Sequence, residues 1–283
     1  MDASQIKLAE LEMIPPMARL VHFLLATPER ETVRPLMASL ITDQPQPLTD
    51  AEQAAAIAPF LWLLERAEAG LALTKAGYMP PADVLALAER LPSMRGWAGK
   101  RKREDLNPEV GNFRKMMMEL GWVCKDKGRL VLTQAGTDIL AHPGQIWGRL
   151  GASLLDSAQP GKVHLDVWVL VLMYLAAGQW PDDEKVGRML GAAGWSNPDG
   201  SPPSEATVRE VARTVYAITD NLGAGGLVRR DKPVSSVVRR FAWQTLVRVV
   251  PLGDDSRRQA ILADMVRGGQ ESGVLGVEAD GGE

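Results

Sequence analysis

The sequence of 283 residues predicts a mainly α-helical fold with short β-hairpins. Apolar residues recur at helical spacing in most segments, and Gly, Pro and capping residues separate these segments. Two apolar stretches, 122–124 and 129–132, instead flank a short polar turn, which is typical of a β-hairpin. With 46% apolar and 24% charged residues, the composition is that of a chain that folds around a core.

Residues 1–69 are predicted to form an N-terminal helical segment. The Thr-Pro-Glu sequence at 27–29 predicts a helix start, and the prolines within 44–47 predict a break between helices. Thr49 followed three residues later by Glu52 is a capping box, so another helix is expected to begin there.

Residues 70–158 are predicted to form a first winged-helix-like unit. A helix capped at 107–109 precedes the predicted hairpin of 122–132, and a helix followed by a two-stranded wing is the order expected of a winged helix. The Gly-Leu-Ala-Leu-Thr-Lys-Ala-Gly sequence at 70–77 is echoed with one gap at 128–136, which suggests a duplicated element.

Residues 159–252 are predicted to form a second winged-helix-like unit. Its expected helices cover 165–177, 182–193 and 205–222. The stretches 227–228 and 239–250 are expected to be the two strands of its wing. Residues 270–283 hold four acids, four glycines and no base, so they are expected to be a disordered tail.

The sequence predicts a cytoplasmic protein with no membrane contact. Residues 1–12 carry both signs of charge and lack the apolar stretch of a secretory signal. The longest uncharged apolar stretch, 167–180, is shorter than the roughly twenty residues that cross a bilayer. The net charge of −3 gives no long-range attraction to nucleic acid, so any such binding must come from a local patch.

No motif for catalysis, metal binding or cofactor binding is readable, so the chain is expected to be non-enzymatic, without a cofactor or a metal. Glycine-rich phosphate loops, a nucleophile elbow and zinc-protease spacing are absent from the sequence. The acids at 182–184 follow a proline and fit the first turn of a helix better than a metal site. Cys124 and His164 are interpreted as packing residues.

Two local excesses of basic residues point to double-stranded DNA as the partner. Residues 95–129 hold ten bases against five acids, and residues 205–250 hold eight against four. Both excesses fall on a predicted partner-facing helix and its wing, where bases would meet phosphates. The residues expected to contact DNA are Arg101, Arg103, Asn112, Arg114, Lys115 and Lys127 in the first unit, and Arg209, Arg213, Arg229, Arg230 and Lys232 in the second.

A protein partner is the alternative that the sequence leaves open. Winged-helix units also serve as protein–protein modules, so the two units could pack on each other or on a second subunit, including a second copy of the chain. DNA binding predicts both basic patches on one continuous exposed face, whereas a scaffold predicts exposed apolar surface there.

Part of the chain resembles a known block of sequence. The motifs are Leu-Thr-Lys-Ala-Gly-Tyr-Met-Pro-Pro at 73–81, Trp-Ala-Gly-Lys-Arg-Lys-Arg-Glu-Asp at 97–105, Gly-Arg-Leu-Val-Leu-Thr-Gln-Ala-Gly at 128–136, and Trp147. Together they are similar to a block, covering roughly residues 60–150, of actinobacterial plasmid- and transposon-associated proteins related to the pRiA-plasmid ORF-three-like family. The resemblance implies a mobile-element context and assigns no catalytic residue.

Overall fold

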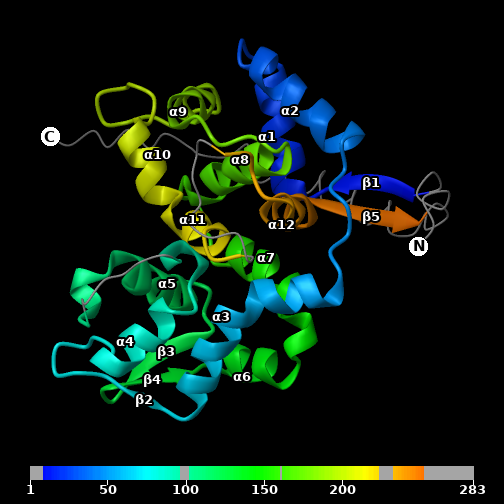
Figure 1. Cartoon of the computed structure of the whole chain (residues 1–283). Helices are drawn as coiled ribbons and strands as arrows, with labels where there is room; N and C mark the ends of the chain where they lie inside the picture. The colour runs from blue at the N-terminus through cyan, green and yellow to red at the C-terminus, as the bar shows by residue number, and fades with distance from the viewer. Residues whose placement is uncertain (1–8, 96–101, 160, 223–231, 252–283) are drawn as a thin grey trace, which may run out of the picture. The chain divides into compact units, whose positions relative to one another are not determined.

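The computed structural model describes residues 9–95, 102–159, 161–222 and 232–251 (Figure 1). It divides into two compact units, which are described separately: residues 1–15 with 247–283, and residues 16–246. The predicted strand at 227–228 and the predicted tail at 270–283 lie outside the described residues.

The first unit contains two strands from opposite ends of the chain. Strand β1 (Ala9–Met13) pairs antiparallel with β5 (Val247–Pro251), so that Met13 lies opposite Val247 and Ala9 lies opposite Pro251. The sequence prediction missed β1, whose partner lies more than two hundred residues away in the chain. Local patterns carry no information on such a pairing.

The second unit is mainly helical. In chain order, its helices and strands are α1 (Pro15–Leu25), α2 (Arg30–Thr42), α3 (Asp50–Glu68), β2 (Leu71–Ala72), α4 (Pro81–Ala88), α5 (Pro108–Glu119), β3 (Val123–Asp126), β4 (Arg129–Leu132), α6 (Gln134–Ala141), α7 (Ile146–Asp156), α8 (His164–Ala176), α9 (Asp183–Ala192), α10 (Glu205–Val211), α11 (Arg213–Thr219) and α12 (Ser236–Leu246). Short 3-10 turns lie at Pro92–Met94, Glu104–Leu106 and Pro143–Gln145.

A three-stranded antiparallel sheet of order β2-β4-β3 confirms the predicted hairpin. Lys127 and Gly128 both have positive φ, which is the geometry of a tight two-residue hairpin turn. The echoed segments 70–77 and 128–136 lie in this one sheet, where Leu71 pairs with Leu130. Helix α3 packs on β4 and on α6, so the sheet shares a core with a helix of the predicted N-terminal segment.

Helix α8 forms the centre of the other half of the unit and is buried from Asp166 to Ala176. Helices α12, α2 and α9 pack around it (Figure 1). Side chains of α12 bond to both α8 and α2: Arg239 Nε donates to the Ala176 carbonyl of α8 over 3.0 Å, and Trp243 Nε1 donates to the Leu40 carbonyl of α2 over 3.0 Å. The predicted buried helix at 165–177 is thus confirmed.

The predicted strand at 239–250 is wrong over most of its length, because residues 239–246 belong to helix α12. The buried positions Val238, Phe241, Ala242 and Leu246 share one helical face, so the segment buries its apolar residues only as a helix. The predicted helix at 205–222 is also divided in two, with Ala212 between α10 and α11. The second half of the chain therefore has no wing built from 239–246.

Candidate nucleic-acid interface and adjoining pocket

Four exposed basic side chains gather at the turn end of the three-stranded sheet. Lys125, Lys127 and Arg129 belong to the β3–β4 hairpin, and Lys75 lies in the turn that follows β2. Asp126 is the acidic residue of the same hairpin. We call Lys75, Lys125, Lys127 and Arg129 the hairpin surface.

Backbone contacts hold the β2 turn against the hairpin. The Leu73 amide donates to the Gly128 carbonyl over 2.8 Å, and Lys125 Nζ donates to the Gly77 carbonyl over 3.0 Å. Gly77 has φ +77°, a conformation that glycine adopts at no steric cost. The turn that carries Lys75 is therefore fixed beside the hairpin.

The expectation that Arg114 lies on the exposed face of its helix is wrong. The Arg114 side chain is 4% exposed, and its Nε donates to Glu104 Oε1 over 2.7 Å. The second oxygen of Glu104 accepts from the Met79 amide over 2.6 Å. Arg114 is placed in the interior because a buried carboxylate from another segment is available to pair with its charge.

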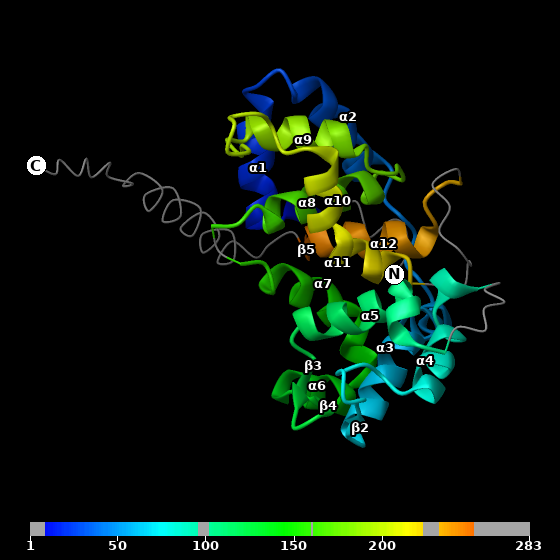
Figure 2. The ribbon, with the colours of Figure 1, turned by 90° about the vertical axis from the view of Figure 1, so that its left-hand side faces the viewer.

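Helix α11 packs against part of the outer face of α5 (Figure 2), while Lys115 and Glu119 on α5 are exposed. Thr214 Oγ1 on α11 donates to Glu119 Oε2 on α5 over 2.6 Å. Nearby, Ser93 Oγ donates to Asn221 Oδ1 over 2.8 Å, which adds a second polar link between these two parts of the chain.

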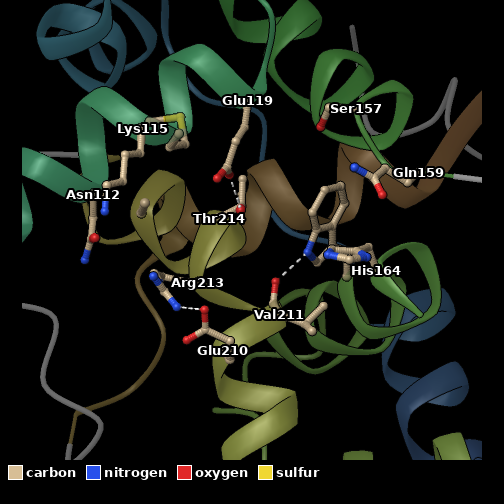
Figure 3. A pocket seen from close by; sticks show the side chains of 13 residues that line it. Asn112, Lys115, Glu119, Ser157, Gln159, His164, Glu210, Val211, Arg213 and Thr214 are labelled. Atoms are coloured by element: carbon tan, nitrogen blue, oxygen red, sulfur yellow. Dashed lines mark hydrogen bonds and ion pairs between the residues drawn. The ribbon is translucent and has the colours of Figure 1, made fainter. Parts of the chain in front are cut away.

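A pocket of about 270 Å³ lies beside this contact and takes in two residues that the sequence assigns to DNA, Asn112 and Lys115 (Figure 3). Both come from α5, and the opposite walls come from α10, α11 and the start of α8. The pocket was not predicted, since it depends on packing between helices about a hundred residues apart. Its main lining residues are Asn112, Lys115, Met116, Glu119, Gln159, His164, Trp168, Glu210, Val211, Arg213, Thr214 and Ala217.

The remaining predicted contacts of the winged-helix-like unit at 70–158 are Arg103 and Arg101. Arg103 is exposed and pairs with Asp105, with Nε to Oδ1 at 3.0 Å. The hydrogen bond with Asp105 raises the pKa of Arg103, so its charge is locally compensated. Arg101 lies outside the described residues.

The predicted contacts of the second half include two arginines held by carboxylates. Arg209 Nη2 lies 2.9 Å from Asp183, a side chain only 3% exposed, and the hydrogen bond raises the pKa of Arg209. Arg213 forms an ion pair with Glu210 one turn away. Lys232 is exposed, whereas Arg229 and Arg230 lie outside the described residues.

The acids at 182–184 have structural partners. Asp182 Oδ1 accepts from the Lys185 amide over 3.1 Å and caps α9, and Asp183 and Glu184 lie in its first turn as predicted. This amide lowers the pKa of Asp182. Over the described ranges, no group of three or more His, Cys, Asp or Glu side chains is placed to hold a metal ion.

The helices differ in length and apolar character. Of those that the structure describes, none combines the length and the apolar character needed to pass through a bilayer.

The hairpin surface shows what sequence reasoning missed. Of its members only Lys127 was among the predicted contacts, whereas Lys75, Lys125 and Arg129 were not. The echo between 70–77 and 128–136 was the available signal, since both segments carry a basic residue next to an apolar strand.

A scan against protein-family models finds no match, and searches of curated proteins and of solved structures find none either. The resemblance of residues 60–150 stays a prediction.

Proposed function

We propose that this chain is a non-enzymatic protein that binds double-stranded DNA through the hairpin surface of a winged-helix-like unit. The observation that carries the proposal is that Lys75, Lys125, Lys127 and Arg129 are exposed at the turn end of one sheet, with Lys125 and Arg129 on its opposite faces. With Asp126, which lies cross-strand from Arg129, these residues give the turn end a local net charge of +3 on an otherwise acidic chain. Such a local charge attracts the phosphates of a duplex.

The order of elements supports the winged-helix part of the proposal. Helix α3 is followed by strand β2, helices α4 and α5, and then the β3–β4 hairpin, whose second strand pairs with β2. In a winged helix the hairpin is the wing, and it lies beside the helix that is presented to the partner. Here that helix is α5.

The contacts of α5 limit how the DNA would be read. Base readout needs side chains that enter a groove, whereas phosphate contacts position the duplex without reading its sequence. Arg114 is buried, and Asn112 and Lys115 line the pocket facing α11. We therefore expect binding with little sequence preference.

The test is a titration of a fluorescently labelled mixed-sequence duplex, followed by anisotropy. Four phosphate contacts predict that the affinity falls on the order of a hundredfold between about 50 and 200 mM salt. A variant with glutamine at Lys75, Lys125, Lys127 and Arg129 should lose most of the affinity and most of the salt dependence.

A matched control variant separates the effect of the hairpin surface on DNA affinity from the effect of the total charge. Glutamine at Arg30, Arg34, Arg149 and Lys162, which are exposed elsewhere, changes the net charge by the same amount and should leave the affinity close to wild type. No binding at low salt, or equal losses in both variants, would overturn the proposal.

A second candidate is a protein-interaction scaffold, and the packing of α5 on α11 favours it. A presentation helix that packs in part against its own chain, with a hydrogen bond between Thr214 and Glu119, is suited to holding two parts of the protein together. This candidate predicts a flat DNA titration at low salt. The same experiment therefore separates the two functions.

A further inference from the structure

Tyr78, an exposed aromatic residue, lies in the same turn as Lys75 of the hairpin surface. Its side chain is 40% exposed, and it follows Lys75 by three residues in the segment between β2 and α4. We propose that Tyr78 stacks on an unpaired base, so that the preferred ligand of the hairpin surface is duplex DNA that ends in a single-stranded overhang. This inference rests on the proposed function and names the class of DNA that the surface prefers.

Hydrogen bonds hold the backbone of Tyr78 in place. The Tyr78 amide donates to Thr74 Oγ1 over 3.2 Å, and the Tyr78 carbonyl accepts from the Thr74 amide over 2.8 Å. The next residue, Met79, is buried, and its amide donates to the buried carboxylate of Glu104 over 2.6 Å. Because the backbone on both sides of Tyr78 is anchored, little conformational entropy is lost when the ring binds a ligand.

Basic side chains lie beside the Tyr78 ring. Lys125 Nζ donates to the carbonyl of Gly77, the residue directly before Tyr78, over 3.0 Å. Arg103 lies near as well, since its pKa is raised mainly by Asp105 and further by the Tyr78 phenol. Over the described ranges, Lys75 and Lys125 form no ion pair. Their charges are therefore available to the phosphates on either side of a nucleotide that stacks on Tyr78.

The combination of a ring with free cations selects unpaired nucleotides. Inside a blunt duplex each base is stacked between its neighbours, so no base presents a flat face to an aromatic side chain. An unpaired base can turn its face to the Tyr78 ring while its phosphates contact lysines, which is how proteins commonly hold single strands. Stacking of this kind accepts every base, in agreement with the low sequence preference expected of the hairpin surface.

The test measures fluorescence anisotropy of three labelled DNAs that share one duplex sequence, titrated with the full-length chain. The first DNA has blunt ends, and the second ends in about four unpaired nucleotides. The third ends in an overhang of the same length that has the sugars and phosphates but no bases. We expect the overhang with bases to bind about tenfold more tightly than the abasic overhang, because stacking of one base contributes on that scale.

Variants assign this preference to one ring. Tyr78→Ala should bind the two overhangs with equal affinity, whereas Tyr78→Phe should keep the preference because it keeps the ring. Phe23→Ala is the matched control, since this ring on α1 is 52% exposed and lies outside the hairpin surface. Its removal should leave the preference at the wild-type value. A preference that survives in Tyr78→Ala, or that is also lost in Phe23→Ala, would overturn the inference.

The blunt duplex separates failure of this inference from failure of the proposed function. Wild type that binds the blunt duplex but does not distinguish the two overhangs would overturn the role of Tyr78 alone, and binding of duplex DNA by the hairpin surface would stand. Absence of binding to all three DNAs at low salt, where electrostatic attraction is strongest, would overturn both.

Discussion

Arg114 donates a hydrogen bond from Nε to the Glu104 carboxylate over 2.7 Å, and both side chains are almost completely buried. Because Glu104 also accepts the Met79 amide, one carboxylate joins α5 to the loop that follows β2. A basic residue that the charge count assigns to the surface is thus part of the packing that holds α5 in place.

Removing the buried acid should destabilise the protein strongly. In Glu104→Gln the Arg114 charge stays buried without its counter-ion, which costs about 3–5 kcal/mol of unfolding free energy. Urea denaturation followed by tryptophan fluorescence measures the loss. Arg103→Gln breaks the exposed pair with Asp105 and should shift the midpoint little. Equal shifts in the two variants would show that the buried pair is not structurally important.

The capping box of α3 should make part of the stability depend on pH. Hydrogen bonds from the backbone and side chain of Thr49 lower the pKa of Glu52 from its ordinary value of 4.5. A lowered folded-state pKa means that this stabilisation is present above the unfolded pKa and is lost as pH falls through the folded pKa.

Glu52→Gln tests this dependence because it removes the titration while keeping a polar acceptor. Wild type should be the more stable protein at neutral pH, and the difference in urea midpoint should shrink steadily below about pH 4.5. A difference that stays constant into acid would contradict the assigned role of the Glu52 charge.

Two helical glycines should respond to alanine in opposite directions. At Gly136, in α6, an added Cβ would collide with the backbone carbonyl oxygen of Trp122, so Gly136→Ala should cost about 1–3 kcal/mol. At Gly148, in α7, nothing lies within 4 Å of the added atom. Gly148→Ala should therefore raise stability by up to about 1 kcal/mol through helix propensity. Thermal unfolding reports both, and a destabilised Gly148→Ala would show that α7 is packed differently.

The hydroxyl of Tyr174 should be dispensable for stability. It is buried without a hydrogen-bond partner among the described residues, and burial raises the pKa of Tyr174 to about 12. Tyr174→Phe removes an unsatisfied polar group and should leave the urea midpoint unchanged or higher. Its absorbance titration should also lose the component near pH 12.

Tyr216→Phe is the matched control for Tyr174. Its hydroxyl donates to Asp183 over 3.3 Å, so the loss should cost about 1 kcal/mol. A larger loss in Tyr174→Phe than in Tyr216→Phe would mean that the Tyr174 hydroxyl has a partner after all.

Local signals predicted the parts of the fold that local interactions determine. The Thr49–Glu52 capping box, the proline break at 44–47 and the β3–β4 hairpin all form as expected, because each depends on residues a few positions apart. The apolar run that became α8 was equally readable.

Contacts between distant segments were not predictable in this way. The pairing of β1 with β5 and the burial of Arg114 against Glu104 both require a partner that no short window contains. At 239–246 the error was one of period, because the buried positions recur at helical spacing, which the strand prediction overlooked. The pocket likewise exists only once α5 meets α11.

The hydrogen bond between Glu119 and Thr214 should couple α5 to α11 energetically. A double-mutant cycle with Glu119→Gln and Thr214→Val should give a coupling of about 1–2 kcal/mol in unfolding free energy, since the acceptor is charged. In a control cycle on Trp147 and Thr214, which bond to different partners, the two losses of unfolding free energy should be additive. Coupling near zero for Glu119 and Thr214 would mean that this hydrogen bond adds nothing to the packing of α11 on α5.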